Sequence, residues 1–434
     1  MAATTDTLRS DGRPKPPPGR TALVELWPPA QAVHALGHGL TFGRGGGDVS
    51  LDRPGISRRH ARVERDAETW RVVDLESRNG SFVNGIAAGA PAVLRDGDLV
   101  RFGPCLLLVV DDADGFRGWR RGALAGPIVG GPAMDRARTF VSRVAASDLE
   151  LLLVGETGTG KDVVATAVHQ KSGVPGPLVS VNCAAVPSDL FESAFFGHRR
   201  GAFTGAQSDA PGYFRAAHDG TLFLDEIGDL ALDGQAKLLR AIESGEVQPV
   251  GAAGPERVRT RIIAATNRPL EDHMRDGTFR RDLFERLGGT ALWLPPLRER
   301  REDVVLLIEH FLGRHAAAAG PPAASPTVRF VEEACLRAWP GNARQLERAV
   351  REALVQARAD GRTELEVGDL PVRAEDEAAR TGEGGESGEL GRVAAALRKS
   401  GGNVARAART LGMGRRTVYA VLERHGRDPG DFRQ

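Results

Sequence analysis

Cysteine is scarce in this chain of 434 residues, and its scarcity argues against two kinds of site. The three cysteines, Cys105, Cys183 and Cys335, lie far apart, are odd in number and do not form the close pairs that zinc sites use. We therefore expect no disulfide framework and no zinc centre, and we expect a cytoplasmic protein. No apolar run approaches the roughly 20 residues of a membrane helix. The N-terminus lacks the apolar segment of a secretion signal, so membrane and secreted classes are set aside.

A net charge of one sign is also lacking, since 58 Lys and Arg residues balance 57 Asp and Glu residues. The charges are nevertheless separated along the chain. Residues 374–389 hold six acids and one arginine among many glycines, which predicts an acidic, flexible linker over about 372–389. Residues 390–434 hold ten basic and three acidic residues. An excess of this kind favours salt-dependent binding to a polyanion.

The pattern of apolar residues divides the rest of the chain. Residues 1–20 predict a disordered tail, and residues 21–112 contain short apolar runs between Gly, Asp and Asn clusters, as in an all-β sandwich or barrel. After a linker at 113–124, strand-like and helix-like runs alternate over 125–371, which predicts a parallel sheet covered on both faces. Helical periodicity alone is found from about 302 to 371. We expect a multidomain fold: an all-β sandwich, an α/β domain with an α-helical lid, and an all-α C-terminal domain.

A glycine-rich segment between a strand-like and a helix-like run predicts a nucleotide site. Its glycines allow backbone N–H groups to surround phosphate oxygens, and its lysine adds a positive charge at the start of the helix. The Ser or Thr that usually follows the lysine is replaced by Asp162, so a carboxylate or another group must reach the metal. The expected ATP-binding residues are Gly155, Glu156, Thr157, Gly158, Thr159, Gly160, Lys161 and Asp162.

A second apolar strand, from Gly220, ends in two acids and fits the same chemistry. Asp225 is expected to hold Mg²⁺, with Asp162 as a further candidate ligand, and Glu226 is expected to activate the attacking water. Read without the glycine-rich loop, the two acids could instead cap a helix. The loop upstream favours catalysis, with ATP and Mg²⁺ as cofactors.

Between these two segments lies the hexapeptide Gly201, Ala202, Phe203, Thr204, Gly205 and Ala206. With this GAFTGA sequence, the chain resembles the bacterial enhancer-binding proteins, which are AAA+ activators of sigma-54 RNA polymerase. The resemblance covers about residues 125–371. It implies that the hexapeptide contacts sigma-54, and that the protein works as a homo-oligomeric ring, expected to be a hexamer.

The same resemblance assigns further catalytic residues. Asn182 would couple the catalytic glutamate to nucleotide state, Thr266 and Asn267 would act as the first sensor, Arg280 and Arg286 as arginine fingers, and Arg344 as the second sensor. The chain departs from the family pattern at Arg199, at Phe284–Glu285 and at Gly288–Gly289. These departures affect the charge of the loop and the subunit interface, but they leave the catalytic set complete.

The basic C-terminal segment reads as a helix, a short glycine turn and a second helix. It resembles the Fis-type helix-turn-helix domain, in which the start of the second helix contacts base edges. The expected DNA-binding residues are Arg415, Arg416, Thr417 and Tyr419. The resemblance implies enhancer DNA as a partner, whereas a basic helical hairpin at a protein interface is the alternative.

In the N-terminal β region, loop positions hold Gly43–Arg44, Ser57–His60, Asp74–Leu75 and Asn79–Gly85. This set resembles a forkhead-associated (FHA) domain, a reader of phosphothreonine peptides, over about residues 21–112. Arg44 and Arg58 can fork onto a phosphate, Ser57 can donate a hydroxyl hydrogen bond, and Asn79 can bond the peptide backbone. His60 matches a structural position and is expected to support the loop. The implied partner is a phosphothreonine-containing protein, such as a Ser/Thr kinase or its substrate. A β-sandwich with basic turns and no ligand is the alternative.

The sequence thus predicts a sigma-54-dependent activator that hydrolyses ATP and is controlled by phosphothreonine recognition. Two other classes remain open. One is an AAA+ remodeller of another target, against which the hexapeptide and the C-terminal segment argue. The other is a phosphopeptide-binding scaffold without enzymatic activity, against which Lys161, Asp225, Glu226 and the finger arginines argue.

Overall fold

The computed structural model describes residues 21–29, 32–67, 69–119, 126–319 and 324–372, together with residues 397 and 404. The chain divides after Leu370, and nearly all of the second unit, Pro371–Gln434, lies outside the described residues. The predicted tail, the acidic linker and the DNA-binding residues fall almost entirely in these undescribed parts and stay predictions. Among the described residues, no helix is long and apolar enough to cross a bilayer.

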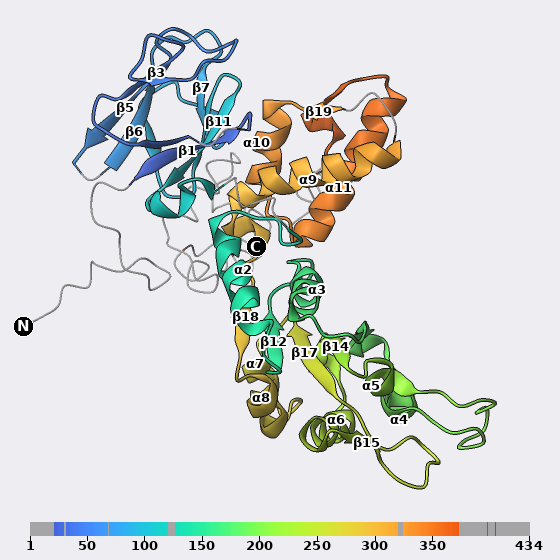
Figure 1. Ribbon diagram of the computed structural model, residues 1–434. Coiled ribbons are helices and arrows are strands. Elements are labelled where there is room, and N and C mark those ends of the chain that lie inside the picture. The colour runs from blue at the N-terminus through green and yellow to red at the C-terminus, as the bar shows by residue number, and fades with distance from the viewer. Residues whose placement is uncertain are drawn as a thin grey trace, which may run out of the picture. The chain divides into compact units, whose positions relative to one another are not determined.

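The N-terminal region is a sandwich of two sheets (Figure 1). One sheet has the order β2-β1-β11-β10-β7-β8 and the other β4-β3-β5-β6-β9. Their bounds are β1 Ala22–Trp27, β2 Val33–Ala35, β3 Thr41–Gly43, β4 Val49–Ser50, β5 Ala61–Asp66, β6 Thr69–Asp74, β7 Ser81–Val83, β8 Ile86–Ala87, β9 Ala92–Leu94, β10 Leu99–Phe102 and β11 Cys105–Val110. Alternate apolar residues such as Phe42 and Phe102 fill the space between the sheets.

The segment after β11, expected to be a linker, contributes to the core. It contains the 3₁₀-helix η1, Asp114–Phe116. Phe116 and Trp119 are buried, and their rings meet edge to face with centroids 5.8 Å apart. The aromatic side chains therefore tie this segment to the surrounding apolar cluster, so its described part is more than a spacer.

The α/β region contains a five-stranded parallel sheet in the order β13-β14-β17-β12-β18. Its strands are β12 Leu151–Val154, β13 Leu178–Asn182, β14 Gly220–Asp225, β17 Thr260–Thr266 and β18 Ala291–Trp293. Side chains of β14 alternate between two cores, because Phe223 faces one and Leu222 and Leu224 face the other. Helices α2 Pro132–Val144 and α3 Lys161–Ser172 cover the first face; α4 Phe191–Phe196, α5 Gly212–Ala216, α6 Leu232–Ser244, α7 Leu270–Arg275 and α8 Arg281–Leu287 cover the second.

The lid is helical, as expected, and its described residues form three helices and one short pair of strands. Helices α9 Arg301–Ala319, α10 Val328–Leu336 and α11 Asn342–Ala359 lie together (Figure 1). Their apolar side chains belong to one cluster. A short parallel pair, β19 Ser325–Pro326 and β20 Glu364–Leu365, joins the start of α10 to the segment after α11. Each of these strands has only two paired residues, and two residues are too few for an apolar periodicity to predict a strand.

Candidate nucleotide, hexapeptide and phosphopeptide sites

The glycine-rich segment forms the turn between β12 and α3, as predicted. Gly158 and Gly160 have φ angles of 79° and 101°, which side chains rarely adopt and glycine adopts freely. Lys161, the first residue of α3, has a side chain that is 6% exposed, and its Nζ donates a 2.8 Å hydrogen bond to the carbonyl of Gly155. The turn therefore holds the ammonium group over the loop, at the positive end of the helix dipole.

The lid fixes this loop from the other side. Asn342, at the start of α11, is fully buried and donates through Nδ2 to the carbonyl of Thr157 at 3.0 Å. The backbone N–H of Ala343 donates to the carbonyl of Gly158 at 3.0 Å. Arg298 forms two hydrogen bonds, of 2.7 and 2.8 Å, with the carboxylate of Glu156, and these bonds hold the pKa of Glu156 below its usual value. Glu156 thus fastens the loop to the segment that leads into the lid.

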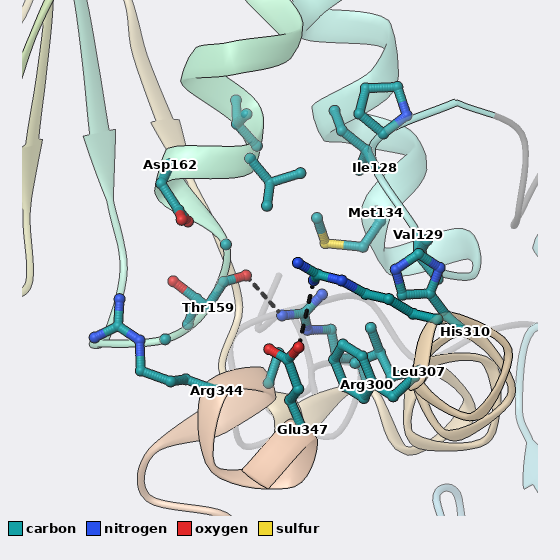
Figure 2. A pocket seen from close by; sticks show the side chains of 18 residues that line it. Ile128, Val129, Met134, Thr159, Asp162, Arg300, Leu307, His310, Arg344 and Glu347 are labelled. Atoms are coloured by element: carbon teal, nitrogen blue, oxygen red, sulfur yellow. Dashed lines mark hydrogen bonds and ion pairs between the residues drawn. The ribbon is translucent and has the colours of Figure 1, made fainter. Parts of the chain in front are cut away.

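A cavity of about 220 Å³ lies between the loop, α2 and the lid (Figure 2). Ile128, Val129, Met134, Leu307 and Phe311 line its apolar part, whereas the loop, Asp162, Arg300, His310, Arg314, Arg344 and Glu347 supply its polar groups. Arg300 is fully buried and donates to the carbonyl of Thr159 at 3.0 Å. An apolar wall beside a phosphate-binding turn suits a ligand with a flat base and a polyphosphate.

The two acids at the end of β14 lie beside this loop. Glu226 has a left-handed φ of 53°, and its Oε2 accepts a 3.0 Å hydrogen bond from the backbone N–H of Asn267. Its Oε1 is 3.9 Å from Nζ of Lys161. Burial raises the pKa of Glu226, while the charge of Lys161 opposes that shift. This carboxylate is therefore positioned next to the phosphate-binding lysine by a strained backbone.

Two of the predicted catalytic residues, Asn182 and Asn267, lie beside the acids at the end of β14. Asn182 is the partner of Asp225 in the pairing of β13 with β14, and its side chain accepts a hydrogen bond from the N–H of Ala184 at 3.0 Å. Asn267 reaches Glu226 through its backbone. Thr266 is buried, and its hydroxyl lies 2.8 Å from the carbonyl of Arg268. Of the predicted sensors, only Arg344 lines the cavity.

The two predicted finger arginines lie near α8 and do not line the cavity of their own chain. Arg280 pairs with Asp282 at 2.7 Å, and Arg286 pairs with Glu150 at 2.6 Å. Both arginine side chains are between 40% and 50% exposed, at 42% and 45%. They are therefore available to a neighbouring molecule.

The hexapeptide forms a tight loop that extends from α4 and α5. The N–H of Gly201 donates to the carbonyl of Ala206 at 2.9 Å, which closes the loop at its base. Phe203 remains 41% exposed near the tip and meets the ring of His198 edge to face. Arg199, one of the departures from the family pattern, pairs with Asp209 at 2.9 Å and with Glu256 at 2.8 Å. These pairs connect the loop to the β15–β16 hairpin, Glu246–Val247 and Glu256–Arg257.

The four predicted phosphothreonine-binding residues lie on three neighbouring loops of the sandwich. The N–H of Arg44 donates to the carbonyl of Ser57 at 2.9 Å, and the hydroxyl of Ser57 accepts from the N–H of Arg78 at 3.0 Å. Asn79 donates to the carbonyl of Gly55 at 2.7 Å. Arg44, Arg58 and Asn79 are exposed.

His60 lies beneath these loops and joins two of them. Its Nδ1 accepts from the N–H of Ser57 at 3.2 Å, so its Nε2 carries the proton and donates to the carbonyl of Gly80 at 3.1 Å. The ring is completely buried, and burial lowers the pKa of His60 below its usual value. His60 therefore supports the loops that present Ser57 and Asn79, as the sequence indicated.

Family models match all of the predicted domains. The sigma-54 interaction domain matches residues 128–292, the AAA+ ATPase lid domain 298–386, the FHA domain 40–103, and the bacterial regulatory protein family of Fis type 389–425. A crystal structure of NtrX from Brucella abortus in complex with ATP is 32% identical, with a TM-score of 0.53 and 69% of each chain covered. This chain belongs to the sigma-54-dependent AAA+ transcriptional activators. The predicted family and fold class are confirmed.

Two curated members of this family show how far the likeness extends. Nitric oxide reductase transcription regulator NorR1 of Cupriavidus necator is 42% identical over 309 residues, which cover 65% of this chain and 60% of that protein. The anaerobic nitric oxide reductase transcription regulator NorR of Salmonella agona is 48% identical over 236 residues, which cover 52% of this chain and 45% of that protein. The chain thus matches about half to three fifths of each activator's length.

Several residues of this activator's site were missed by the sequence reading. Arg298, Arg300 and Asn342 hold the phosphate loop, and His310 lines the cavity. The first two arginines stand in the run PPLRERRED between the sheet and the lid. Such a dense group of charges between two apolar elements could have indicated a buried polar junction.

The close approach of the lid to Gly158 gives a testable prediction. A methyl group at Gly158 would overlap the carbonyl oxygen of Gly341, whereas a methyl group at Gly173, whose φ of 69° is similar, would meet nothing within 4 Å. We expect Gly158→Ala to weaken binding of a fluorescent ATP analogue by tenfold or more. Gly173→Ala should cost about 1–2 kcal/mol of stability and leave binding unchanged. Equal affinities of the two variants would contradict the proposed lid contact.

Proposed function

We propose that this activator hydrolyses ATP in a homo-oligomeric ring and that, bound to enhancer DNA, it uses the GAFTGA loop to remodel sigma-54 RNA polymerase. Its activity is controlled by phosphothreonine binding to the FHA domain. The observation that carries the proposal is a phosphate loop that lines one cavity together with the lid, with Lys161 at the end of this loop 3.9 Å from Glu226. Phe203 is exposed on a loop of the same domain. A cavity of this composition favours ATP over a ligand without a base.

The residues around the phosphate loop fit the binding of Mg²⁺ with the nucleotide. Asp162 lines the cavity and Asp225 ends β14 beside Glu226, and carboxylate oxygens suit this cation. When bound, the cation would neutralise charge on the phosphates. Glu226 is the group that would take a proton from the attacking water, because its carboxylate is held by Asn267 and faces Lys161.

The positions of the finger arginines support a ring. A finger must reach the nucleotide to stabilise the transition state, and such a contact can change the rate by about 10³–10⁵. Arg280 and Arg286 pair with acids of their own chain outside the cavity lining. A second copy is therefore needed to bring them to the nucleotide, and a head-to-tail contact of this kind forms a ring when its rotation closes.

Glu226 gives a prediction for the reaction itself. Glu226→Gln should bind the fluorescent ATP analogue normally and lower the rate of phosphate release by about 10²–10⁴. In the unchanged protein, activity should fall as the pH is lowered through the pKa of Glu226. Since burial raises this pKa above 4.5, the loss should begin at a higher pH than for an exposed glutamate. Glu271→Gln, which changes an exposed residue, serves as the control. Full activity of Glu226→Gln would contradict the assignment of Glu226 as the catalytic base.

The hexapeptide gives a prediction for the output. Thr204→Ala should keep the ATPase rate of the ring and lose open-complex formation at a sigma-54 promoter, because the loop lies on an insertion away from the nucleotide cavity. Permanganate footprinting of promoter DNA measures the open complex. Full open-complex formation by this variant would refute the role of the loop. If every loop variant kept its promoter activity, the result would instead favour an AAA+ remodeller of another target.

The FHA loops give a prediction for control. Arg44→Ala combined with Ser57→Ala should abolish binding to a phosphothreonine peptide library in calorimetry, because two of the three expected phosphate contacts are removed and Arg58 alone remains. Arg95→Ala, an exposed arginine on another loop of the sandwich, is the matched control and should bind like the unchanged chain. Unchanged binding by the double variant would end the assignment, and so would equal binding of the unphosphorylated peptides.

A further inference from the structure

Three neighbouring strands of the FHA sandwich are buried on both faces. In β11, Cys105, Leu107 and Val109 belong to the core between the sheets, whereas Leu106, Leu108 and Val110 belong to the apolar cluster of the lid. Strands β1 and β10 divide in the same way, with Leu23 and Val100 in the sandwich and Val24 and Leu99 in the lid cluster. The outer face of this sheet therefore packs against α9 and α10 of the same chain.

A buried ion pair joins the two domains at this face. Nε of Arg101, on β10, lies 2.6 Å from a carboxylate oxygen of Glu332, on α10, across 231 residues of sequence. The two side chains are only 9% and 7% exposed. The guanidinium also lies 3.8 Å from the ring centroid of Phe82. Removing one partner of such a pair leaves an uncompensated charge, so the contact is sensitive to small displacements of either domain.

The FHA side of this pair connects to the phosphothreonine loops. Arg101 donates to the carbonyl of Gly103 at 3.3 Å, and the N–H of Gly103 donates to the carbonyl of Gly80 at 3.2 Å. The same carbonyl accepts from His60, and Gly80 follows Asn79 in the chain. Two residues, Gly80 and Gly103, thus link Asn79, the asparagine expected to bind the peptide, to the buried Arg101.

The lid side of the interface connects to the nucleotide cavity. Arg301, the first residue of α9, donates to the carbonyl of Gly97 in the FHA domain at 2.8 Å. Its neighbour Arg300 donates to the carbonyl of Thr159 in the phosphate loop at 3.0 Å. Two consecutive residues therefore contact the FHA domain and the phosphate loop, and a shift of the start of α9 must alter both contacts.

We propose that the β1–β11–β10 face of the FHA domain is a docking surface for the lid of its own chain, and that this interface couples phosphothreonine binding to nucleotide binding. The inference rests on the proposed function of both sites. Coupling between two binding sites is reciprocal, and typical couplings change affinity by about 5–150-fold. Each ligand therefore changes the affinity of the protein for the other by the same factor.

The experiment measures this factor in both directions on the full chain. Fluorescence anisotropy gives the dissociation constant of a phosphothreonine peptide, selected from the library, with and without saturating non-hydrolysable ATP analogue. Titration of a fluorescent nucleotide with and without saturating peptide gives the reciprocal value. We expect both ratios to differ from one by about fivefold or more, and to equal each other.

Variants of the Arg101–Glu332 ion pair test whether this contact couples the two binding sites. Glu332→Gln should bring both ratios close to one, while the peptide affinity measured without nucleotide stays near that of the unchanged chain. Because this change buries an unpaired arginine, the double variant Arg101→Met with Glu332→Leu removes the pair and keeps the interface apolar. It should show the same loss of coupling. Glu352→Gln, on α11, removes a lid carboxylate that pairs with Arg348 and should leave both ratios unchanged.

The outcomes separate the two proposals. Peptide binding with ratios of one in the unchanged chain would overturn the coupling and leave phosphothreonine recognition intact. Absence of peptide binding would overturn both. Coupling that persists in the double variant would overturn the role of the Arg101–Glu332 interface.

Discussion

The double attachment of the phosphate loop is the constraint on which the nucleotide site depends. From the sheet side, β12 and α3 give the loop its start and its end; from the lid side, Asn342 and Ala343 bond to the carbonyls of Thr157 and Gly158. Loop carbonyls that bond to the lid cannot turn towards phosphate, so the N–H groups remain on the ligand side. The lid therefore contributes to the shape of the phosphate site itself, in addition to lining the cavity.

The same attachment explains why charged residues are buried at the junction. Arg300 is completely buried between Thr159 and Asp303, whose carboxylate also accepts a hydrogen bond from the N–H of Gly131. An isolated charge at this position would be costly, but each group has partners from a different segment of the chain. The junction thus joins the phosphate loop, the start of α2 and the start of α9 through one polar network.

Whether a feature could be predicted from the sequence depends on how far apart its contacting residues lie along the chain. The turn at residues 155–161 and the acids after β14 are local patterns, and the sequence reading found both. The hydrogen bonds of Arg298 with Glu156 join residues 142 apart, and nothing in the local sequence of either residue reveals the other. The run CLLLVV of β11 was read as a strand, but its unbroken apolar character also indicated burial on both faces.

The Arg101–Glu332 pair gives this two-sided burial a defined geometry. An apolar sheet face can pack against a helix in several registers with similar energy, because dispersion and hydrophobic burial are not directional. A buried guanidinium is satisfied only where a carboxylate meets it, and displacement of α10 along β10 would leave both charges without a partner. Since Arg301 also reaches Gly97, which lies two residues before β10, two polar contacts rather than one hold the lid on the sheet. The FHA domain is therefore held in one orientation on the lid. This fixed orientation is required if a movement of the FHA loops is to shift α9.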